Sequence, residues 1–424
     1  MKVPKVAYVF ALFICLFMYL YLKNPFQRIQ NVLGFSIQAT LEHPMPQDFY
    51  GIMFDAGSTG TRIHVFEFTK MPSESPKLAH ETFKALKPGL SAYSDAPHLA
   101  MKGIQELLDI AKESVPRDLW ASTPLVLKAT AGLRLLPGVK AEQLLDKVKE
   151  VFQLSPFLVM NGCVSIMDGT DEGISAWITV NFLIDSLQGS KHNTAGILDL
   201  GGGSTQVTFL PHSEMTLQNS PINYITSIQM FNRTYTLYSH SPQLGTAHGR
   251  DILLKLAKDI EKGQELVSPC LSPDYKAEWK HAEIVYSIKG QKAGEPLYDS
   301  CYARIEKILH KKVHKPEEVG NLSFYAFSYY YDRAVDVGLI DAEKGGTLKV
   351  EDYRREAKRV CQSMESKSTD KPFLCMDLIY ITVLLEELGF QKDAVLKLAR
   401  KIDGVESSWA LGATFHYIDS LHRN

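Results

Sequence analysis

One pattern occurs twice in the chain: an apolar strand leads into an aspartate, a turn of small residues and a second strand. Tyr-Gly-Ile-Met-Phe precedes Asp55, and Ala-Gly-Ser-Thr-Gly-Thr follows it before Arg-Ile-His-Val-Phe-Glu-Phe. Ala-Gly-Ile-Leu precedes Asp199, and Leu-Gly-Gly-Gly-Ser-Thr follows it before Gln-Val-Thr-Phe-Leu. Each copy is typical of a β-hairpin. The long interval between the copies predicts two similar lobes, because the repeats of a solenoid are far shorter.

The residues of these turns are suited to phosphate. Glycine lets successive backbone N–H groups converge on one point, and hydroxyl groups add further donors. A carboxylate at the strand end can hold a divalent cation through water. One such turn alone is equally compatible with an ordinary tight hairpin, whereas the same aspartate at the same offset in both favours a polyphosphate clamp. The first turn is neither a Walker loop, which needs Gly-Lys-Ser/Thr, nor a dinucleotide fingerprint, which leads into a helix.

Two segments between the turns carry further polar groups. Pro-Leu-Val-Leu-Lys-Ala predicts a buried strand that ends at Thr130 and Ala131, followed by a glycine-containing turn with Arg134. The second segment predicts a short strand and then a helix, with Thr170 as its N-cap and Glu172 in its first turn. A first-turn carboxylate usually complements the helix dipole at the surface. This segment on its own therefore does not mark a catalytic group.

The composition narrows the class of protein. The 424 residues are 45% hydrophobic and 22% charged, which indicates a globular chain of about two to three domains or one large bilobal unit. Lys and Arg number 46 against 48 Asp and Glu, and the net charge of −2 argues against a nucleic-acid binder held by a basic field. Six cysteines without a Cys-x-x-Cys pair argue against a disulfide-built miniprotein and against that kind of zinc site.

The N-terminus predicts entry into the secretory pathway. An uncharged apolar run, 6–22, exceeds the roughly 7–15 residues of a signal-peptide core and approaches the about 20 residues that span a bilayer. We therefore favour a membrane anchor within residues 1–28 over a cleaved signal, with residues 29–48 as a stalk. Asn232 and Asn321 begin glycosylation sequons, which agrees with a lumenal chain.

The cysteines beyond the N-terminal segment suit disulfides. Four paired cysteines allow three connectivities. The two close couples, Cys270 with Cys301 and Cys361 with Cys375, are the economical pairing and leave Cys163 free. In an oxidising lumen disulfides are favoured over the alternative of buried thiols.

Five motifs together resemble the apyrase-conserved regions of the ectonucleoside triphosphate diphosphohydrolases. They are DAGSTGTR (55–62), KATAGLRLL (128–136), GTDEG (169–173), DLGGGSTQ (199–206) and WALGATFHY (409–417). The resemblance covers about residues 48–424 and is greatest to the small Golgi or secreted members. It implies an α/β, duplicated actin-like or RNase-H-like two-lobe fold with the active site in the cleft. The N-terminal lobe would comprise 49–168 plus 405–424, and the C-terminal lobe 169–404.

The resemblance also implies a role for each motif residue. Glu172 matches the general base that deprotonates an attacking water, and Ser204 and Gln206 match the residues that orient this water. Asp55 and Asp199 match the residues that hold Ca²⁺ or Mg²⁺ through water. The phosphate-binding residues would be Gly57, Ser58, Thr59, Gly60, Thr61, Arg62, Thr130, Gly201, Gly202 and Gly203. Tyr329 would stack on the base, although an ordinary core tyrosine is an equal alternative for this aromatic run.

The implied function is that of a lumenal nucleoside diphosphatase. It would hydrolyse GDP, UDP and IDP, and triphosphates more weakly, as a monomeric single-pass type II protein of the Golgi membrane with a soluble secreted form. One alternative is a non-hydrolysing nucleotide-binding protein on the same fold; another is an exopolyphosphatase-like phosphatase. The chain departs from the family pattern at 241–250, a loop that lies near the nucleotide in the family.

Overall fold

The structure is a computed structural model that describes residues 47–70, 75–187, 193–231, 233–245, 265–281 and 284–423. The chain divides into two units. In the described part of the smaller unit, Phe49 stacks on Phe68 with ring centroids 5.1 Å apart, and Thr69 donates a hydrogen bond to Asp48. The larger unit, 50–67 and 79–424, contains every predicted catalytic, phosphate-binding, metal-binding and disulfide residue.

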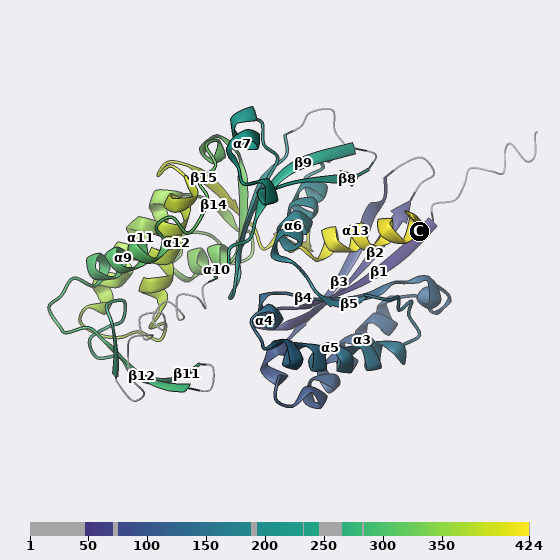
Figure 1. The fold of residues 1–424 in the computed structure, drawn as a ribbon, viewed down its shortest axis with the longest axis horizontal. Helices are drawn as coiled ribbons and strands as arrows, with labels where there is room; N and C mark the ends of the chain where they lie inside the picture. Colours follow the sequence, from purple (N-terminus) through teal and green to yellow (C-terminus); the bar gives the residue numbers. More distant parts are fainter. Residues whose placement is uncertain are drawn as a thin grey trace, which may run out of the picture. The chain divides into compact units, whose positions relative to one another are not determined.

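The first sheet has the strand order β3-β2-β1-β4-β5. Its strands are β1 Gln47–Ala56, β2 Thr61–Lys70, β3 Lys77–Leu86, β4 Leu125–Ala129 and β5 Val164–Ile166. The helices α3 (Ala100–Ser114) and α5 (Gly138–Gln153) lie side by side, and their apolar faces share one core with β1 and β4 (Figure 1). Short 3-10 helices span Leu90–Tyr93, Pro97–Leu99 and Arg117–Ser122.

The second sheet has the order β14-β15-β13-β6-β7-β9-β8. Its strands are β6 Gly196–Leu200, β7 Thr205–Phe209, β8 Ile225–Met230, β9 Arg233–His240, β13 Phe324–Ser328, β14 Gly346–Lys349 and β15 Val395–Leu398. The helices associated with it are α7 Glu214–Asn219, α9 Leu297–Leu309, α10 Tyr329–Asp336, α11 Val350–Met364 and α12 Leu374–Leu388. Helix α12 is apolar on all sides and accordingly buried along most of its length.

The remaining elements are shorter or connect the two sheets. They are α4 Ala131–Arg134, α6 Gly169–Leu183, α13 Ala410–Arg423, β10 Glu265–Ser268, β11 Lys276–His281, β12 Ile284–Gly290, β16 Lys401–Ile402, β17 Val405–Glu406 and the 3-10 helices Ile222–Tyr224 and Val319–Asn321. Helix α6 is buried on nearly every side, because it packs against both α13 and the strands of the second sheet.

The repeated strand-turn-strand pattern is confirmed as a structural duplication. Strands β1 and β2 are neighbours in the first sheet, and β6 and β7 pair antiparallel in the second. The first turn thus connects β1 to β2, and the second connects β6 to β7. In the second copy Asp199 lies opposite Gln206, so two predicted site residues share one register position.

Three local predictions need correction. The strand expected to end at Thr130 and Ala131 ends at Ala129, and Arg134 lies in the short helix α4 instead of a turn. The Thr130 carbonyl accepts hydrogen bonds from the N–H groups of Leu133 and Arg134, which begins the helix there. The N-cap of α6 is Asp168, not Thr170, since the Asp168 carboxylate accepts a 2.7 Å hydrogen bond from the Thr170 N–H.

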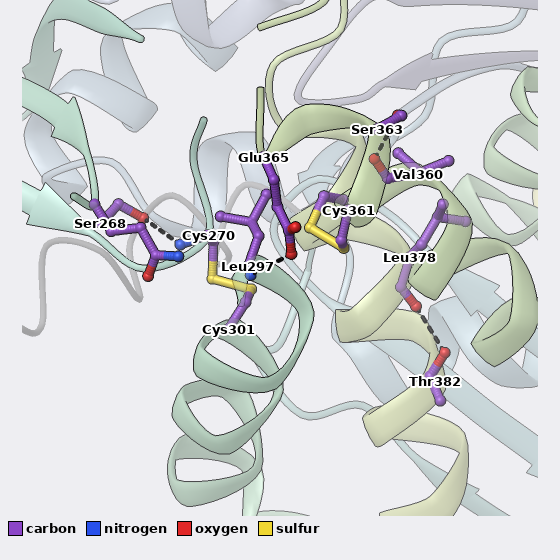
Figure 2. Close-up of a disulfide and its surroundings, with 12 residues drawn as sticks. Ser268, Cys270, Leu297, Cys301, Val360, Cys361, Ser363, Glu365, Leu378 and Thr382 are labelled. Atoms are coloured by element: carbon purple, nitrogen blue, oxygen red, sulfur yellow. Dashed lines mark hydrogen bonds between the residues drawn. A yellow bond between two sulfur atoms is a disulfide. The ribbon is translucent and has the colours of Figure 1, made fainter. Parts of the chain in front are cut away.

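The predicted disulfides are confirmed. Cys270 pairs with Cys301 and Cys361 with Cys375, while Cys163 is a buried free thiol. The first bridge ties α9 to the segment after β10, and the second links α11 to the start of α12 (Figure 2). Glu365 reinforces this region by accepting a hydrogen bond from the N–H of Leu297, the first residue of α9.

Several predictions concern residues outside the described part of the chain. The anchor, most of the stalk, the Asn232 acceptor and residues 246–250 belong to this group. Among the residues that are described, no helix is long and apolar enough to cross a membrane. Asn321 is described and exposed, at the end of a 3-10 helix. The division into lobes at 168 and 404 stays a prediction.

Candidate active site

The two strand-end aspartates are buried carboxylates with unused hydrogen-bonding capacity. Asp55 is 5% exposed and Asp199 is 7% exposed. Arg62 donates a 2.7 Å hydrogen bond to Oδ2 of Asp55. In the described chain Oδ1 of each aspartate has no hydrogen-bond partner. A buried carboxylate oxygen without a partner is costly, so these two atoms are suited to a cation or its water shell.

The two glycine-rich turns meet each other. Each turn is closed by a backbone hydrogen bond, from Gly57 to Gly60 at 3.0 Å and from Gly201 to Ser204 at 2.9 Å. A Cβ atom added at Gly202 would lie 2.6 Å from Oγ of Ser58. The tips of the two turns are therefore in contact, which is what a shared phosphate site requires.

The segment after β4 reaches the same place. A Cβ atom added at Gly132 would lie 2.8 Å from Cα of Ser58, and one added at Gly203 would lie 2.7 Å from Cβ of Ala131. Thr130, 6% exposed, donates its N–H to the carbonyl of Ala56, next to Asp55. The three predicted phosphate-binding segments thus converge.

Arg134 connects Glu172 to the second turn. Its Nη2 atom donates to Oε2 of Glu172 at 2.8 Å and to Oγ of Ser204 at 3.1 Å, while Nη1 donates to the carbonyl of Met167 at 2.8 Å. Arg134 is not among the site residues that the sequence motifs predict. The signal that could have found it is its position after a buried strand, within the motif that supplies Thr130.

Gln206 and Ser204 complete this hydrogen-bond network. Gln206 is 1% exposed, and its Nε2 atom donates to Oγ of Ser204 and to Oγ of Ser241, each at 2.9 Å. The N–H of Thr205 donates to the carbonyl of Pro242 at 3.1 Å. The start of β7 is thereby fixed against the segment that follows β9.

The buried position of Glu172 changes its acidity. Burial raises the pKa of Glu172 from 4.5 to about 8; Arg134 opposes this increase, while Asp199 and Asp55 add to it. Burial also raises the pKa of Asp199 to about 6. The pKa of Arg62 is raised, chiefly by Asp55. Although Arg134 and Glu172 lie at ion-pair distance, desolvation is the larger effect, and it makes Glu172 a much stronger base than an exposed glutamate.

Tyr329 stands apart from its neighbours in the aromatic run. Tyr330 and Tyr331 are buried in the core, whereas Tyr329 is half-buried and carries the Arg333 guanidinium 5.1 Å from its ring centroid. Tyr329 directly follows β13, the strand in which Phe327 lies opposite Asp199 of β6. Of the three tyrosines Tyr329 alone is partly exposed, and the core alternative holds for the other two.

Most of the predicted site residues are joined by direct contacts, and the remaining ones lie outside this set. Contacts between residues of four motifs join Glu172, Ser204, Gln206, Ser58, Thr130 and the glycines of both turns. In the described regions no group of three or more His, Cys, Asp or Glu side chains could hold a metal ion. Asn321 and the disulfides do not take part in these contacts.

A buried glutamate, a serine and a glutamine linked to it through Arg134, and two touching glycine-rich turns are the parts that a hydrolase acting on phosphate groups would need. Comparison with known proteins agrees. Residues 43–423 match the GDA1/CD39 (nucleoside phosphatase) family, and the chain belongs to this family. It is therefore an enzyme of the nucleoside phosphatase class, as the motifs predict.

The relatives are similar over most of their length. The chain is 61% identical to human ectonucleoside triphosphate diphosphohydrolase 6 over 381 residues, which cover 88% of this chain and 78% of the relative. It is 54% identical to human nucleoside diphosphate phosphatase ENTPD5, with 88% of each chain covered. A crystal structure of nucleoside triphosphate hydrolases from Neospora caninum superposes with a TM-score of 0.66 over 94% of this chain and 98% of that one. At 14% identity this likeness shows the fold alone, and it confirms the α/β two-lobe prediction.

The raised pKa of Glu172 predicts a pH-dependent stability difference between the wild type and Glu172→Gln. The unfolded carboxyl loses its proton near pH 4.5 and the folded one near pH 8, so the folded wild type loses stability as pH rises between these values. We expect the wild type to lose on the order of a few kcal/mol relative to the Gln variant over this window. Thermal unfolding of both proteins in excess chelator, from pH 4 to 9, measures the difference, and parallel curves would contradict it.

Proposed function

We propose that this protein is a lumenal nucleoside diphosphatase that releases the terminal phosphate of GDP, UDP and IDP, and of triphosphates more weakly. The observation that carries the proposal is the position of Glu172. Its carboxylate is buried, bonded through Arg134 to Ser204, and next to two touching turns suited to phosphate. Such a carboxylate is suited to take a proton from a water molecule that attacks a bound phosphate.

The step is a single displacement. The water oxygen forms a bond to the terminal phosphorus while the bond from phosphorus to the bridging oxygen breaks, and that electron pair leaves with the nucleoside monophosphate. The water proton passes to Glu172. Ser204 and Gln206 are hydrogen-bonded to each other and position the water. Holding the water in place makes its attack on the phosphorus effectively unimolecular.

The two turns would hold the negative charge of the transferred group. Backbone N–H groups of the segments 57–61 and 201–203 and the hydroxyls of Ser58 and Thr59 supply the donors. Arg62 is fixed by Asp55 and adds positive charge next to the first turn. The contact between the two turns means that one phosphate group can take donors from both copies of the duplicated hairpin.

Asp55 and Asp199 would hold Ca²⁺ or Mg²⁺ through water molecules. The unpartnered Oδ1 atoms and the hard oxygen character of both side chains support this assignment. A cation bound there would neutralise charge on the phosphate oxygens. It would also lower the pKa of Glu172 from the value in the free protein, through its positive charge.

The remaining proposals concern the substrate and the compartment. The half-buried ring of Tyr329 would stack on the base, and GDP is our preferred substrate. The names of the relatives support nucleotide substrates, since one is a nucleoside diphosphate phosphatase. The proposed protein is a monomeric type II protein of the Golgi membrane with a secreted form. The apolar segment 6–22, the two disulfides and the exposed Asn321 acceptor support its entry into the secretory pathway.

A substrate panel tests the proposed function. Purified protein lacking the N-terminal segment is supplied with Mg²⁺ or Ca²⁺ and with GDP, UDP, IDP, GTP, ATP or inorganic polyphosphate, and released phosphate is measured. We expect the diphosphates to have the highest kcat/KM, because an added phosphate would displace the base from Tyr329. Triphosphates cleaved at least as well would indicate a general apyrase. Preference for polyphosphate would indicate an exopolyphosphatase, and binding without release would indicate a nucleotide-binding protein.

We predict that Glu172→Gln retains nucleotide binding while kcat falls about 10²–10⁴-fold. The amide keeps the shape of the side chain but cannot accept the proton of the water. Phosphate release with GDP and calorimetric binding of GDP measure the two quantities on the same preparations. Turnover within a few-fold of the wild type would remove Glu172 from the role of base.

We predict that activity requires a divalent cation and that Asp55→Ala and Asp199→Ala each raise the cation concentration needed for half-maximal rate. Each substitution removes one of the two buried carboxylates that fit the cation. Titration of Mg²⁺ and Ca²⁺ at fixed GDP gives these concentrations. Asp146→Ala, an exposed aspartate on α5, is the control that leaves them unchanged. Full activity in excess chelator would contradict the prediction.

A further inference from the structure

Ser241 touches the site although none of the motifs includes it. It directly follows strand β9, and its Oγ atom accepts a 2.9 Å hydrogen bond from Nε2 of Gln206. A Cβ atom added at Gly169, the first residue of α6, would collide with Oγ of Ser241. The serine therefore lies between the helix that carries Glu172 and the strand that carries Gln206.

In the structure the NH₂ end of the Gln206 amide faces two serine hydroxyl groups. An amide NH₂ group has two N–H donors, and both are used, one on Ser204 and one on Ser241. The carbonyl oxygen Oε1 is then the atom that Gln206 has left to offer, and Oε1 can only accept. If the partner at Ser241 is removed, one N–H loses its acceptor and the amide is free to present either end.

The same count applies to Ser204. A hydroxyl has two lone pairs and one proton, and Oγ of Ser204 accepts from both Arg134 and Gln206. Its proton is therefore directed outward as a donor. Arg134 occupies Oε2 of Glu172, so Oε1 is the carboxylate oxygen that would take the proton of the attacking water.

We propose that Ser241 is a positioning residue that fixes the Gln206 amide with Oε1 toward the attacking water, an inference that rests on the proposed function. The water would donate one hydrogen to Glu172 and one to Gln206, and accept one from Ser204. Its second lone pair then has a single direction left, toward the phosphorus. An inverted amide would offer an N–H to the water and compete for that lone pair.

A double-mutant cycle on kcat with GDP and Mg²⁺ tests the proposal. Loss of one neutral hydrogen bond, about 0.5–1.5 kcal/mol, converts to a fall of about two- to thirteenfold in kcat for Ser241→Ala, with KM unchanged. Because Ser241 acts through Gln206, the substitution should have no further effect in a Gln206→Ala background. Ser241→Cys keeps the shape with a weaker acceptor and should give an intermediate rate.

Ser239→Ala is the matched control. Ser239 lies two residues earlier on β9 and is 1% exposed. Its Oγ hydrogen-bonds Oγ1 of Thr208 and donates to the carbonyl of Thr170, and it does not bond Gln206. It should lower the unfolding temperature and leave kcat within about twofold. The proposal is overturned if Ser241→Ala has the wild-type kcat, or if its effect persists in the Gln206→Ala background. If Gln206→Ala itself has no effect on kcat, the role of Gln206 in the proposed function fails, and with it the role of Ser241.

Discussion

The arrangement of the site depends on one guanidinium group. Arg134 stands on the four-residue helix α4, and it bonds the carboxylate of Glu172 on α6, the hydroxyl of Ser204 in the second turn and the backbone before α6. Burying Glu172 without such a partner would leave a carboxylate with no compensation. With Arg134 in place the carboxylate stays near the turns, yet desolvation still keeps its pKa high.

The duplicated hairpin imposes the second constraint. Each copy places an aspartate at the end of a buried strand and a glycine-rich turn directly after it. The turns touch where Gly202 faces Ser58, and a side chain on that glycine would separate them. Neither turn alone supplies two carboxylates, so a cation site of this kind requires both copies. The sequence of one turn alone contains neither the second carboxylate nor the contact, so it is equally compatible with an ordinary hairpin.

Most of the architecture was readable in the sequence. The paired Asp-plus-turn motifs predicted the two hairpins, and the spacing of the cysteines predicted both disulfides. Capping was misjudged, because Asp168 and Thr170 are both good N-caps and only the backbone path distinguishes them. Arg134 and Ser241 were missed for another reason. Their importance lies in contacts to residues 38 and 35 positions away, respectively, which no local pattern encodes.

The proposed hydrolysis requires that water, and not a side chain of the protein, attacks the phosphorus. The stereochemical course at phosphorus tests it most directly, with a nucleoside diphosphate whose terminal phosphorus is made chiral by sulfur and oxygen isotopes. One direct displacement by a water held by Glu172, Ser204 and Gln206 predicts inversion of configuration in the released thiophosphate. Retention would require two displacements through a phosphorylated side chain and would contradict the account.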